Sequence, residues 1–312
     1  NFHCTNQTWK LLYANNQELI FYVEDYDLGN YLYTVPLMLA DGSSFPQMEK
    51  AKKICKCNKE LEEPRQGDLY ADSDYIVYQD GMYQIHVYDR KKKTFVKIKG
   101  IPGTNMYLSG LVGKYFILSS KPYKEKGKEK YAFSYYKIGS DQIHIMDPAC
   151  YTSAAAIGDK KRKQVIYALR KGIWTYDLKQ DKKKRLVKWN KKDYVSEMCI
   201  RKNRLFVFTG EKDEVYSYSL TGKEKQLHYE KEFTETLKKY EQENDLELVI
   251  DSVDVVNNKI CIHSWQDDEY LIYLCYDPAT KQLKKVRKSD PEMLYFLLCW
   301  DGASVDEWDR DE

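Results

Sequence analysis

The residues whose types could support catalysis are scattered along this chain rather than grouped in a motif. No Gly-x-Ser-x-Gly sequence is present, and the five histidines are widely separated, at His3, His86, His144, His228 and His263. His86, His144 and His263 alternate with apolar neighbours as strand residues do, which favours a structural role over proton transfer. The sequence therefore indicates no catalytic residue.

Motifs for metals and cofactors are equally weak. Cys55-Lys56-Cys57 lacks the two-residue spacer and the second ligand pair of a zinc site. The segment Asp25 to Asn30 begins like a calcium loop, but the acidic residue that should close an EF-hand loop is missing. An Asx-rich hairpin turn accounts for the same residues. We expect no metal and no cofactor.

Aromatic residues give the strongest indication of a binding surface. The chain contains 28 tyrosines and 6 tryptophans, more than strand propensity alone requires. Tyrosine and tryptophan combine a large contact area with a polar group, which suits recognition. The candidate ligand-binding residues are three tyrosines and two acids: Tyr70, Tyr107, Tyr151, Glu197 and Asp251.

A recurring hairpin predicts the elements that must position these residues. Its strand reads Ile-His-Val-Tyr-Asp, Ile-Trp-Thr-Tyr-Asp, Val-Tyr-Ser-Tyr-Ser and Leu-Cys-Tyr-Asp in successive copies. The aligned tyrosines are Tyr88, Tyr135, Tyr176, Tyr218 and Tyr276, so the steps are 47, 41, 42 and 58 residues, the last including a helical insertion. A strand-only repeat of about 40 to 50 residues is the signature of β-propeller blades.

We predict an all-β propeller in one domain over residues 1–312, with six four-stranded blades and seven as the alternative. The blades are expected at residues 9–57, 68–100, 106–147, 151–189, 195–229 and 248–286. Residues 230–243 carry apolar side chains at helical spacing, which predicts a short helix that covers a blade edge or docks a partner. Residues 293–312 are expected to supply a closing strand and an acidic tail.

The tyrosine hairpins also carry a resemblance. Tyr276-Asp277-Pro278-Ala279-Thr280-Lys281 and its equivalents resemble hairpins of bacterial extracytoplasmic propellers of the TolB and YncE kind. The resemblance extends over most of the chain but rests on short motifs, so it implies an architecture and carries over no functional residue. Because a propeller gathers its innermost strands around one axis, we predict that the five candidate residues converge at one mouth of an axial channel.

Charge and hydropathy exclude two classes of partner. The 50 Lys and Arg residues nearly balance the 48 Asp and Glu residues, so the sequence predicts no nucleic-acid partner. No apolar stretch reaches the roughly 18 residues that a membrane-spanning helix needs, so no transmembrane segment is expected. The chain opens at Asn1 rather than at methionine, which indicates a removed leader that could have carried a lipid anchor.

The cysteines do not form an obvious disulfide framework. Cys199, Cys261, Cys275 and Cys299 lie in apolar strand patterns, and we predict that they are reduced core residues. Cys4 could form a bridge with Cys55 or Cys57.

Together these features predict a monomeric, non-enzymatic, extracytoplasmic binding module with an aromatic, acid-dotted axial face. Its partner would be a sugar, a peptide or a protein. One alternative is a carbohydrate-active hydrolase or lyase that uses channel carboxylates. Another is a structural scaffold at the cell surface. Two facing acids in a deep funnel would favour the enzyme, a shallow aromatic face would favour binding, and a plugged axis would favour the scaffold.

Overall fold

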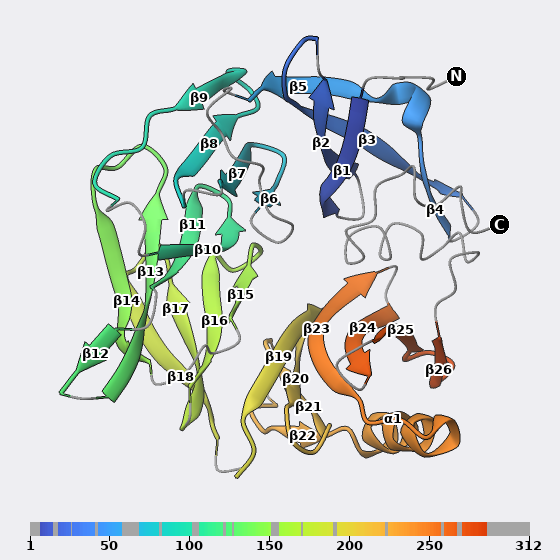
Figure 1. The fold of residues 1–312 in the computed structure, drawn as a ribbon. Helices are drawn as coiled ribbons and strands as arrows, with labels where there is room; N and C mark the ends of the chain where they lie inside the picture. The colour runs from blue at the N-terminus through green and yellow to red at the C-terminus, as the bar shows by residue number, and fades with distance from the viewer. Residues whose placement is uncertain are drawn as a thin grey trace. The chain divides into compact units, whose positions relative to one another are not determined.

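The strands of this chain form six antiparallel sheets, and one α-helix follows the fifth (Figure 1). The computed structural model describes residues 7–14, 18–25, 27–40, 43–57, 69–80, 83–101, 106–120, 123–126, 128–150, 156–169, 171–189, 192–221, 224–256, 259–266 and 270–285, and the count of sheets refers to these residues. No helix within them is long and apolar enough to cross a bilayer. The predicted closing strand at residues 293–312 lies outside the described residues.

The chain divides into two compact units. The described residues of the first unit extend to Pro148, apart from residues 128–130, and carry the first three sheets. The second unit continues from Ala149 and carries the last three sheets together with the helix.

The first unit contains two five-stranded sheets with a four-stranded sheet between them in sequence. The first sheet has the order β1-β2-β3-β4, with β5 also paired to β3: β1 (Gln7–Ala14), β2 (Glu18–Asp25), β3 (Tyr31–Ala40), β4 (Ser43–Pro46) and β5 (Lys52–Lys56), with a 3-10 turn at Met48–Lys50. The second sheet is β6 (Leu69–Ala71), β7 (Tyr75–Gln79), β8 (Ile85–Asp89) and β9 (Thr94–Val96). The third has the order β10-β11-β13-β12, with β14 paired to β13: β10 (Met106–Val112), β11 (Tyr115–Ser120), β12 (Tyr123–Glu125), β13 (Lys128–Lys137) and β14 (Ile143–Cys150).

The second unit contains three four-stranded sheets whose strands pair in sequence order. They are β15 (Ala156–Asp159), β16 (Gln164–Leu169), β17 (Gly172–Asp177) and β18 (Lys182–Lys188); β19 (Val195–Arg201), β20 (Arg204–Thr209), β21 (Val215–Ser219) and β22 (His228–Tyr229); and β23 (Val249–Val256), β24 (Lys259–Gln266), β25 (Tyr270–Asp277) and β26 (Gln282–Lys285). The helix α1 (Lys231–Asn244) precedes the last sheet.

The predicted all-β class with six blade-like sheets and one helical insertion is confirmed. Two sheets differ from the expected four strands. The ten-residue strand β3 extends beyond its pairing with β5 and pairs there with β4, and the Lys-rich segment before β13 adds the short strand β12. Both additions lengthen a hairpin and leave the four-strand order of the blade intact.

An aspartate-initiated turn explains why the hairpin sequence recurs. After β8, Asp89 Oδ1 accepts the backbone N–H groups of the second and third residues that follow it, and Lys93 then has a φ of 55°. Asp177 accepts the same two N–H groups after β17, and Asp277 accepts that of the second residue after β25, again with a positive φ four residues later in both turns. The aspartate side chain replaces a backbone acceptor, so the turn forms from local sequence alone.

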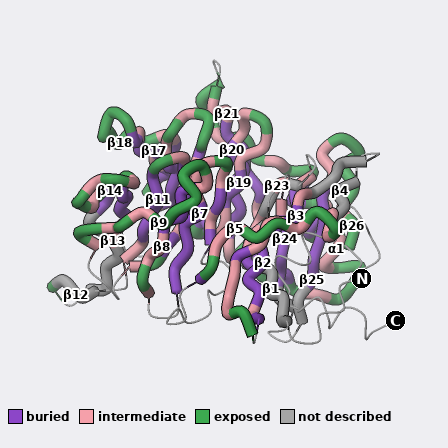
Figure 2. Tube along the Cα trace, turned by 90° about the horizontal axis from the view of Figure 1, so that it is seen from above, coloured by how far each residue is buried: buried purple, intermediate pink, exposed green. Residues whose placement is uncertain are grey.

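Alternating side chains join neighbouring sheets within the first unit. Val77 and Tyr78 are successive residues of β7, so they point to opposite faces, and both are fully buried. Tyr78 packs in the cluster shared with the first sheet, and Val77 packs in the cluster shared with the third. The Arg90 guanidinium adds a two-point ion pair to Glu18 across the first two sheets, at 2.5 and 2.7 Å. Figure 2 shows the buried stretches concentrated in the strands.

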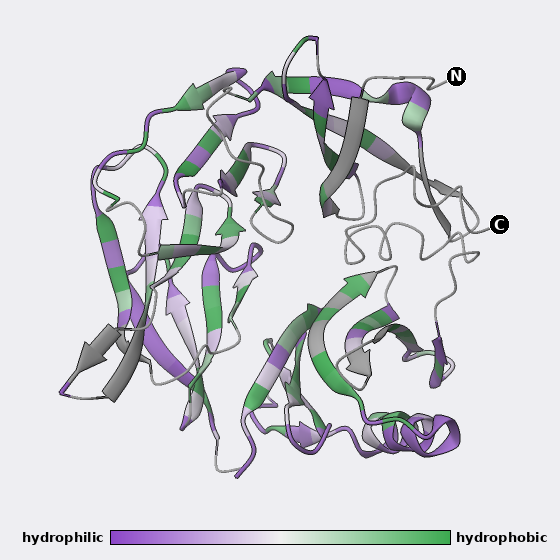
Figure 3. Cartoon of the chain, viewed as in Figure 1, coloured by the Kyte–Doolittle hydropathy of each residue, from purple (hydrophilic) through white to green (hydrophobic). Residues whose placement is uncertain are grey.

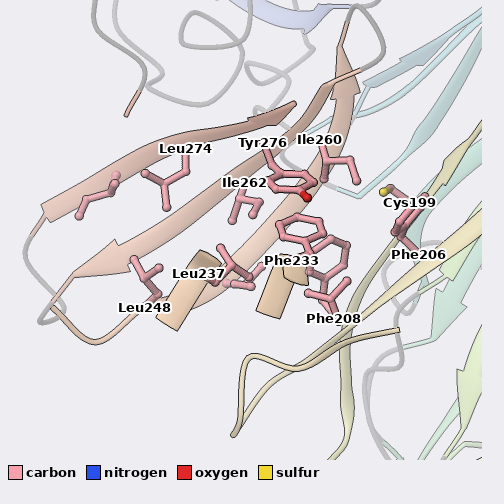
Figure 4. Packing of buried hydrophobic residues seen from close by; sticks show 13 residues of the cluster. Cys199, Phe206, Phe208, Phe233, Leu237, Leu248, Ile260, Ile262, Leu274 and Tyr276 are labelled. Atoms are coloured by element: carbon pink, nitrogen blue, oxygen red, sulfur yellow. The ribbon is translucent and has the colours of Figure 1, made fainter. Parts of the chain in front are cut away.

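The helix α1 packs its apolar side onto the second unit. Phe233 stacks on Tyr276 of β25 with ring centroids 3.9 Å apart and meets Phe208 of β20 edge to face at 5.8 Å (Figure 4). The Thr234 hydroxyl accepts the N–H of Val215 at 2.9 Å, which joins the helix start to β21. The rest of the helix surface is largely hydrophilic (Figure 3). These contacts place the helix against β20 and β21 of one sheet and β25 of the next.

The first strands of neighbouring sheets lie side by side within each unit. In the first unit β6 contacts both β1 and β10, and in the second β19 contacts both β15 and β23. Residues at the beginnings of these strands are therefore brought close to residues of the adjacent sheet.

Candidate binding clusters

In the first unit, one buried side chain fixes the beginning of β10. Gln79 ends β7 and is 1% exposed. Its Nε2 donates to the carbonyl oxygens of Tyr83 at 3.0 Å and Met106 at 2.7 Å. Its Oε1 accepts the N–H of Leu108 at 3.0 Å. The two bonds to β10 flank Tyr107 in sequence, so they hold the backbone on both sides of that residue.

The Tyr107 ring is presented on this fixed backbone. It is 36% exposed and meets the Tyr83 ring edge to face, with centroids 5.6 Å apart and an interplanar angle of 78°. Tyr83 has a φ of 64°, a conformation that side chains larger than glycine rarely adopt, and its N–H donates to the carbonyl of Asp80 at 2.9 Å. We call Gln79, Asp80, Tyr83, His86 and Tyr107 the Tyr107 cluster.

An Asp–His pair supports the turn that carries Tyr83. Asp80 is buried, and its carboxylate accepts the N–H of Gln84 at 2.8 Å and contacts His86 Nε2 at 2.8 Å. A carboxylate beside an imidazole can hold a general base in position. Here the pair is built into the turn, because the imidazole also stacks on the ring of Tyr78 at 4.9 Å.

The three histidines expected on strands each pack on a tyrosine ring. His144 stacks on Tyr135 at 4.9 Å and His263 stacks on Tyr273 at 5.0 Å, as His86 does on Tyr78. His86 and His263 lie directly opposite their tyrosines in the strand register. These contacts support the structural role that the sequence predicted for all three.

The second unit presents an exposed tyrosine just before β19. Tyr194 is 57% exposed. The carboxylate of the preceding Asp193 is buried and accepts the N–H groups of Tyr194, Glu211 and Lys212 at 2.8, 3.0 and 3.1 Å. The backbone of Tyr194 also accepts the N–H of Gly210 at 3.2 Å. The turn after β20 and the start of β19 are thereby joined.

Gly210 leaves the space that the Tyr194 ring occupies. A Cβ atom at this position would lie 2.2 Å from Cζ of Tyr194 and 2.4 Å from its hydroxyl. The ring therefore lies directly over the backbone of the turn. We call Asp193, Tyr194, Gly210 and Asp213 the Tyr194 cluster.

Asp213 gives this second cluster an unusual electrostatic character. Burial, followed by the negative charges of Glu241 and Asp193, raises the pKa of Asp213 to about 7. Lys238 opposes this increase, and Glu247 adds to it. Asp213 Oδ1 is buried and has no hydrogen-bond partner among the described residues. The carboxyl group can therefore change its charge near neutral pH.

Bulges mark the places of the two predicted acids. The register of β19 shifts just before Glu197, and the register of β23 shifts at Asp251. The two strands lie side by side in the second unit. A bulge bends the strand and re-aims the side chains next to it, and bulges often accompany functional sites. The structure thus brings the backbone positions of Glu197 and Asp251 to adjacent strands.

The other predicted site residues have different environments. Tyr70 is half-buried and packs against the cluster between the second and third sheets, so it contributes to packing between blades. Tyr151 lies outside the described residues. The convergence of all five candidates at one channel mouth stays a prediction, because the five belong to both units.

Sequence reasoning missed Tyr194 and Gln79. Tyr194 immediately precedes a predicted innermost strand, so the rule that selected Tyr107 could also have selected it. Gln79 gave no signal, because its partners Met106 and Leu108 lie 27 and 29 residues away. Among the residues that the structure describes, no group of three or more His, Cys, Asp or Glu side chains could hold a metal ion.

Comparison with solved structures identifies the architecture. The chain is similar to a prolyl endopeptidase, with a TM-score of 0.57 and 11% identity over 90% of this chain and 43% of that one. It is also similar to oligopeptidase B from Leishmania major, with a TM-score of 0.54 and 10% identity over 92% of this chain and 42% of that one. The fold is a β-propeller. Its six sheets are the blades.

These likenesses establish the fold and leave the activity open. The chain spans less than half the length of either peptidase, at 43% and 42%. No protein-family model and no curated protein sequence matches it. Membership of the TolB and YncE kind, and a bacterial source, stay predictions.

Proposed function

We propose that this propeller is a non-enzymatic binding module in which the exposed rings of Tyr107 in the first unit and Tyr194 in the second each offer a separate contact surface to a polar ligand. A sugar or a peptide suits these rings, because each combines apolar faces with hydrogen-bonding groups. The observation that carries the proposal is that both tyrosines are exposed while the backbone beside them is held by hydrogen bonds with the buried side chains of Gln79 and Asp193.

The fixed backbones favour binding because little backbone ordering remains to oppose association. Exposed aromatic rings on mobile loops lose conformational freedom when a ligand binds, whereas preorganised rings lose less. One or two aromatic contacts of this kind supply only a few kcal/mol, which supports an affinity on the order of millimolar. The proposal also places the protein outside the cytoplasm, as a monomer without a nucleic-acid partner.

Single and double Tyr→Ala substitutions test the proposal. Tyr107→Ala, Tyr194→Ala and the double variant are screened with the parent protein on glycan and peptide arrays, and hits are measured by calorimetry. Tyr229→Ala is the matched control, because Tyr229 is 46% exposed on β22 and belongs to neither cluster. We expect at least tenfold weaker binding for a cluster variant and unchanged binding for the control. Equal loss in the control, or no ligand on either array, would contradict the proposal.

The hydrolase alternative rests on a different observation, the adjacent bulged strands that carry Glu197 and Asp251. Two carboxylates about 5 to 10 Å apart are the requirement for glycoside hydrolysis. Assays with a panel of glycosides, with Glu197→Gln as the inactive comparison, separate this alternative from binding. Turnover that Glu197→Gln abolishes would replace the binding proposal. The third alternative, a structural scaffold, predicts that neither array yields a ligand.

A further inference from the structure

Two buried cysteines face each other across the middle strands of the last sheet. Cys261 of β24 and Cys275 of β25 are direct partners in the antiparallel register. Their sulfur atoms are 3.3 Å apart, and both residues are thiols in this structure. Cys261 is fully buried and Cys275 is 7% exposed.

Direct pairing on antiparallel strands places the backbones of these two residues within the range of a disulfide bond. Directly opposite residues of antiparallel strands have Cα atoms about 4.5 or 5.5 Å apart, depending on the hydrogen-bonding pattern. Disulfides form with Cα atoms about 4.4 to 6.8 Å apart and sulfur atoms about 2.05 Å apart. Rotation about the two Cα–Cβ bonds can close the remaining gap between the sulfur atoms, and the strands need not change register.

The face of the sheet on which the pair lies is distinct from the hydrophobic cluster beneath α1. Ile260 and Ile262 flank Cys261 on β24 and belong to that cluster, so Cys261 points to the opposite face. His263 and Tyr273 lie on the same face as the cysteines, one pleat further along each strand, and their rings stack at 5.0 Å. The stacked rings pack beside the pair.

We propose that Cys261 and Cys275 form a cross-strand disulfide when the chain folds under oxidising conditions. The oxidant is a disulfide-bearing molecule, either a small-molecule disulfide or a thiol oxidoreductase in its disulfide form. The more exposed Cys275 thiolate attacks one sulfur of the oxidant, and a mixed disulfide forms as the first thiolate leaves. The Cys261 thiolate then attacks the Cys275 sulfur and displaces the second thiolate. The two protein thiols lose two electrons and two protons, and the oxidant becomes two thiols.

The sequence pattern predicted reduced thiols at both positions, and the register changes that expectation. An apolar strand pattern shows only that each cysteine is buried, whereas the bond depends on which residue lies opposite. The proposal is independent of the ligand-binding clusters, which belong to other sheets.

Other cysteines of the described residues provide internal comparisons. Cys199 lies in the cluster beneath α1, on a different sheet. A hydrogen bond with Cys57 and burial raise the pKa of the Cys55 thiol, which lowers its nucleophilicity at neutral pH. We therefore expect Cys55 to react more slowly, and Cys199 to stay reduced where Cys261 and Cys275 are oxidised. Cys4, the predicted partner of Cys55 or Cys57, lies outside the described residues.

Thiol mapping after refolding tests the proposal. The reduced, denatured chain is refolded in mixtures of reduced and oxidised glutathione, quenched with acid, and alkylated with N-ethylmaleimide in denaturant. Peptide mass mapping should show that Cys261 and Cys275 lose alkylation together and appear as one linked peptide pair. In Cys261→Ala, alkylation of Cys275 should return, and in Cys275→Ala that of Cys261 should return. The Cys199→Ala control should resemble the parent protein.

Two results would overturn the proposal. One is full alkylation of both cysteines in the refolded parent protein at every glutathione ratio. The other is a linkage of either cysteine to a different partner. Because these results come from the parent chain, they stand even if an alanine variant fails to fold. The melting temperature of the oxidised parent should also exceed that of the reduced parent by several degrees, and Cys261→Ala should show no such dependence on reductant.

Discussion

The Tyr107 and Tyr194 clusters hold an exposed tyrosine in two different ways. In the first, the uncharged Gln79 amide makes three hydrogen bonds to the backbone. In the second, the charged Asp193 carboxylate accepts three, and a second acid, Asp213, lies half-buried nearby. The Gln79 amide carries no charge, whereas the second cluster should lose stability as Asp213 ionises. The comparison shows that one blade architecture can hold an exposed tyrosine with either an uncharged amide or a charged carboxylate.

The largest loss of stability is expected from replacing Gln79, the uncharged side chain that holds the backbone beside Tyr107. Gln79→Leu keeps the side-chain volume but leaves the carbonyls of Tyr83 and Met106 and the N–H of Leu108 without their partner. Each buried polar group left unsatisfied costs about 1 to 3 kcal/mol, so we expect a loss of about 3 kcal/mol in the free energy of unfolding. Urea denaturation measures it. Gln84→Leu is the control, since Gln84 is exposed, and an equal loss there would contradict the role assigned to Gln79.

A smaller and pH-dependent effect is expected at Asp213. Its folded pKa of about 7 lies above the ordinary value of 3.8, so the folded state holds this proton more tightly than the unfolded state. The associated stability is complete below about pH 4 and is lost as the pH rises through 7. After allowance for solvent screening, Asp213→Asn should be more stable than the parent by about 1 to 2 kcal/mol at pH 8.

The check on Asp213 is the pH profile rather than a single value. Urea midpoints of the parent and Asp213→Asn should nearly coincide at pH 4 and separate progressively up to pH 8. A constant difference across this range would show that the substitution acts through packing. The stability difference between the parent and Gln79→Leu should show no comparable dependence on pH, because Gln79 carries no charge.

Removal of either tyrosine ring should lower the free energy of unfolding only slightly. The loss should be larger for Tyr107 than for Tyr194. Tyr107→Ala loses the edge-to-face contact with Tyr83, so we expect a decrease of about 1 kcal/mol in the free energy of unfolding. Tyr194 is more exposed, and Tyr194→Ala should cost about 0.5 kcal/mol or less. Thermal denaturation of both variants measures the difference. Unfolding of either variant would indicate a core tyrosine and weaken the binding proposal.

The smallest stability effect, with a distinct effect on binding, is expected at Gly210. A methyl group there would meet the end of the Tyr194 ring, which can swing outward into solvent. Gly210→Ala should therefore leave the melting temperature nearly unchanged while displacing the ring. Ligands that depend on Tyr194 should bind as weakly to Gly210→Ala as to Tyr194→Ala. Unchanged binding would mean that the ring position over Gly210 has no part in recognition.

Local sequence was sufficient to predict the blades, because the hairpins are formed by neighbouring residues. Alternation places Val77 and Tyr78 on opposite faces, and Asp89, Asp177 and Asp277 close their turns with N–H groups two or three residues away. The helix was predictable for the same reason, since Phe233 and Leu237 recur at helical spacing and are both buried.

The clusters depended on contacts that no local pattern encodes. Cys275 opposite Cys261, the Gln79 amide beside Tyr107 and the acids around Asp213 come from segments 14 to 34 residues away in sequence. Each of these contacts depends on which strands and turns become neighbours. Composition indicated that tyrosines and acids would be available for binding. Only the tertiary structure decided that Tyr70 packs between blades while Tyr194 is exposed, because burial depends on the adjacent sheet and not on the residue's own strand.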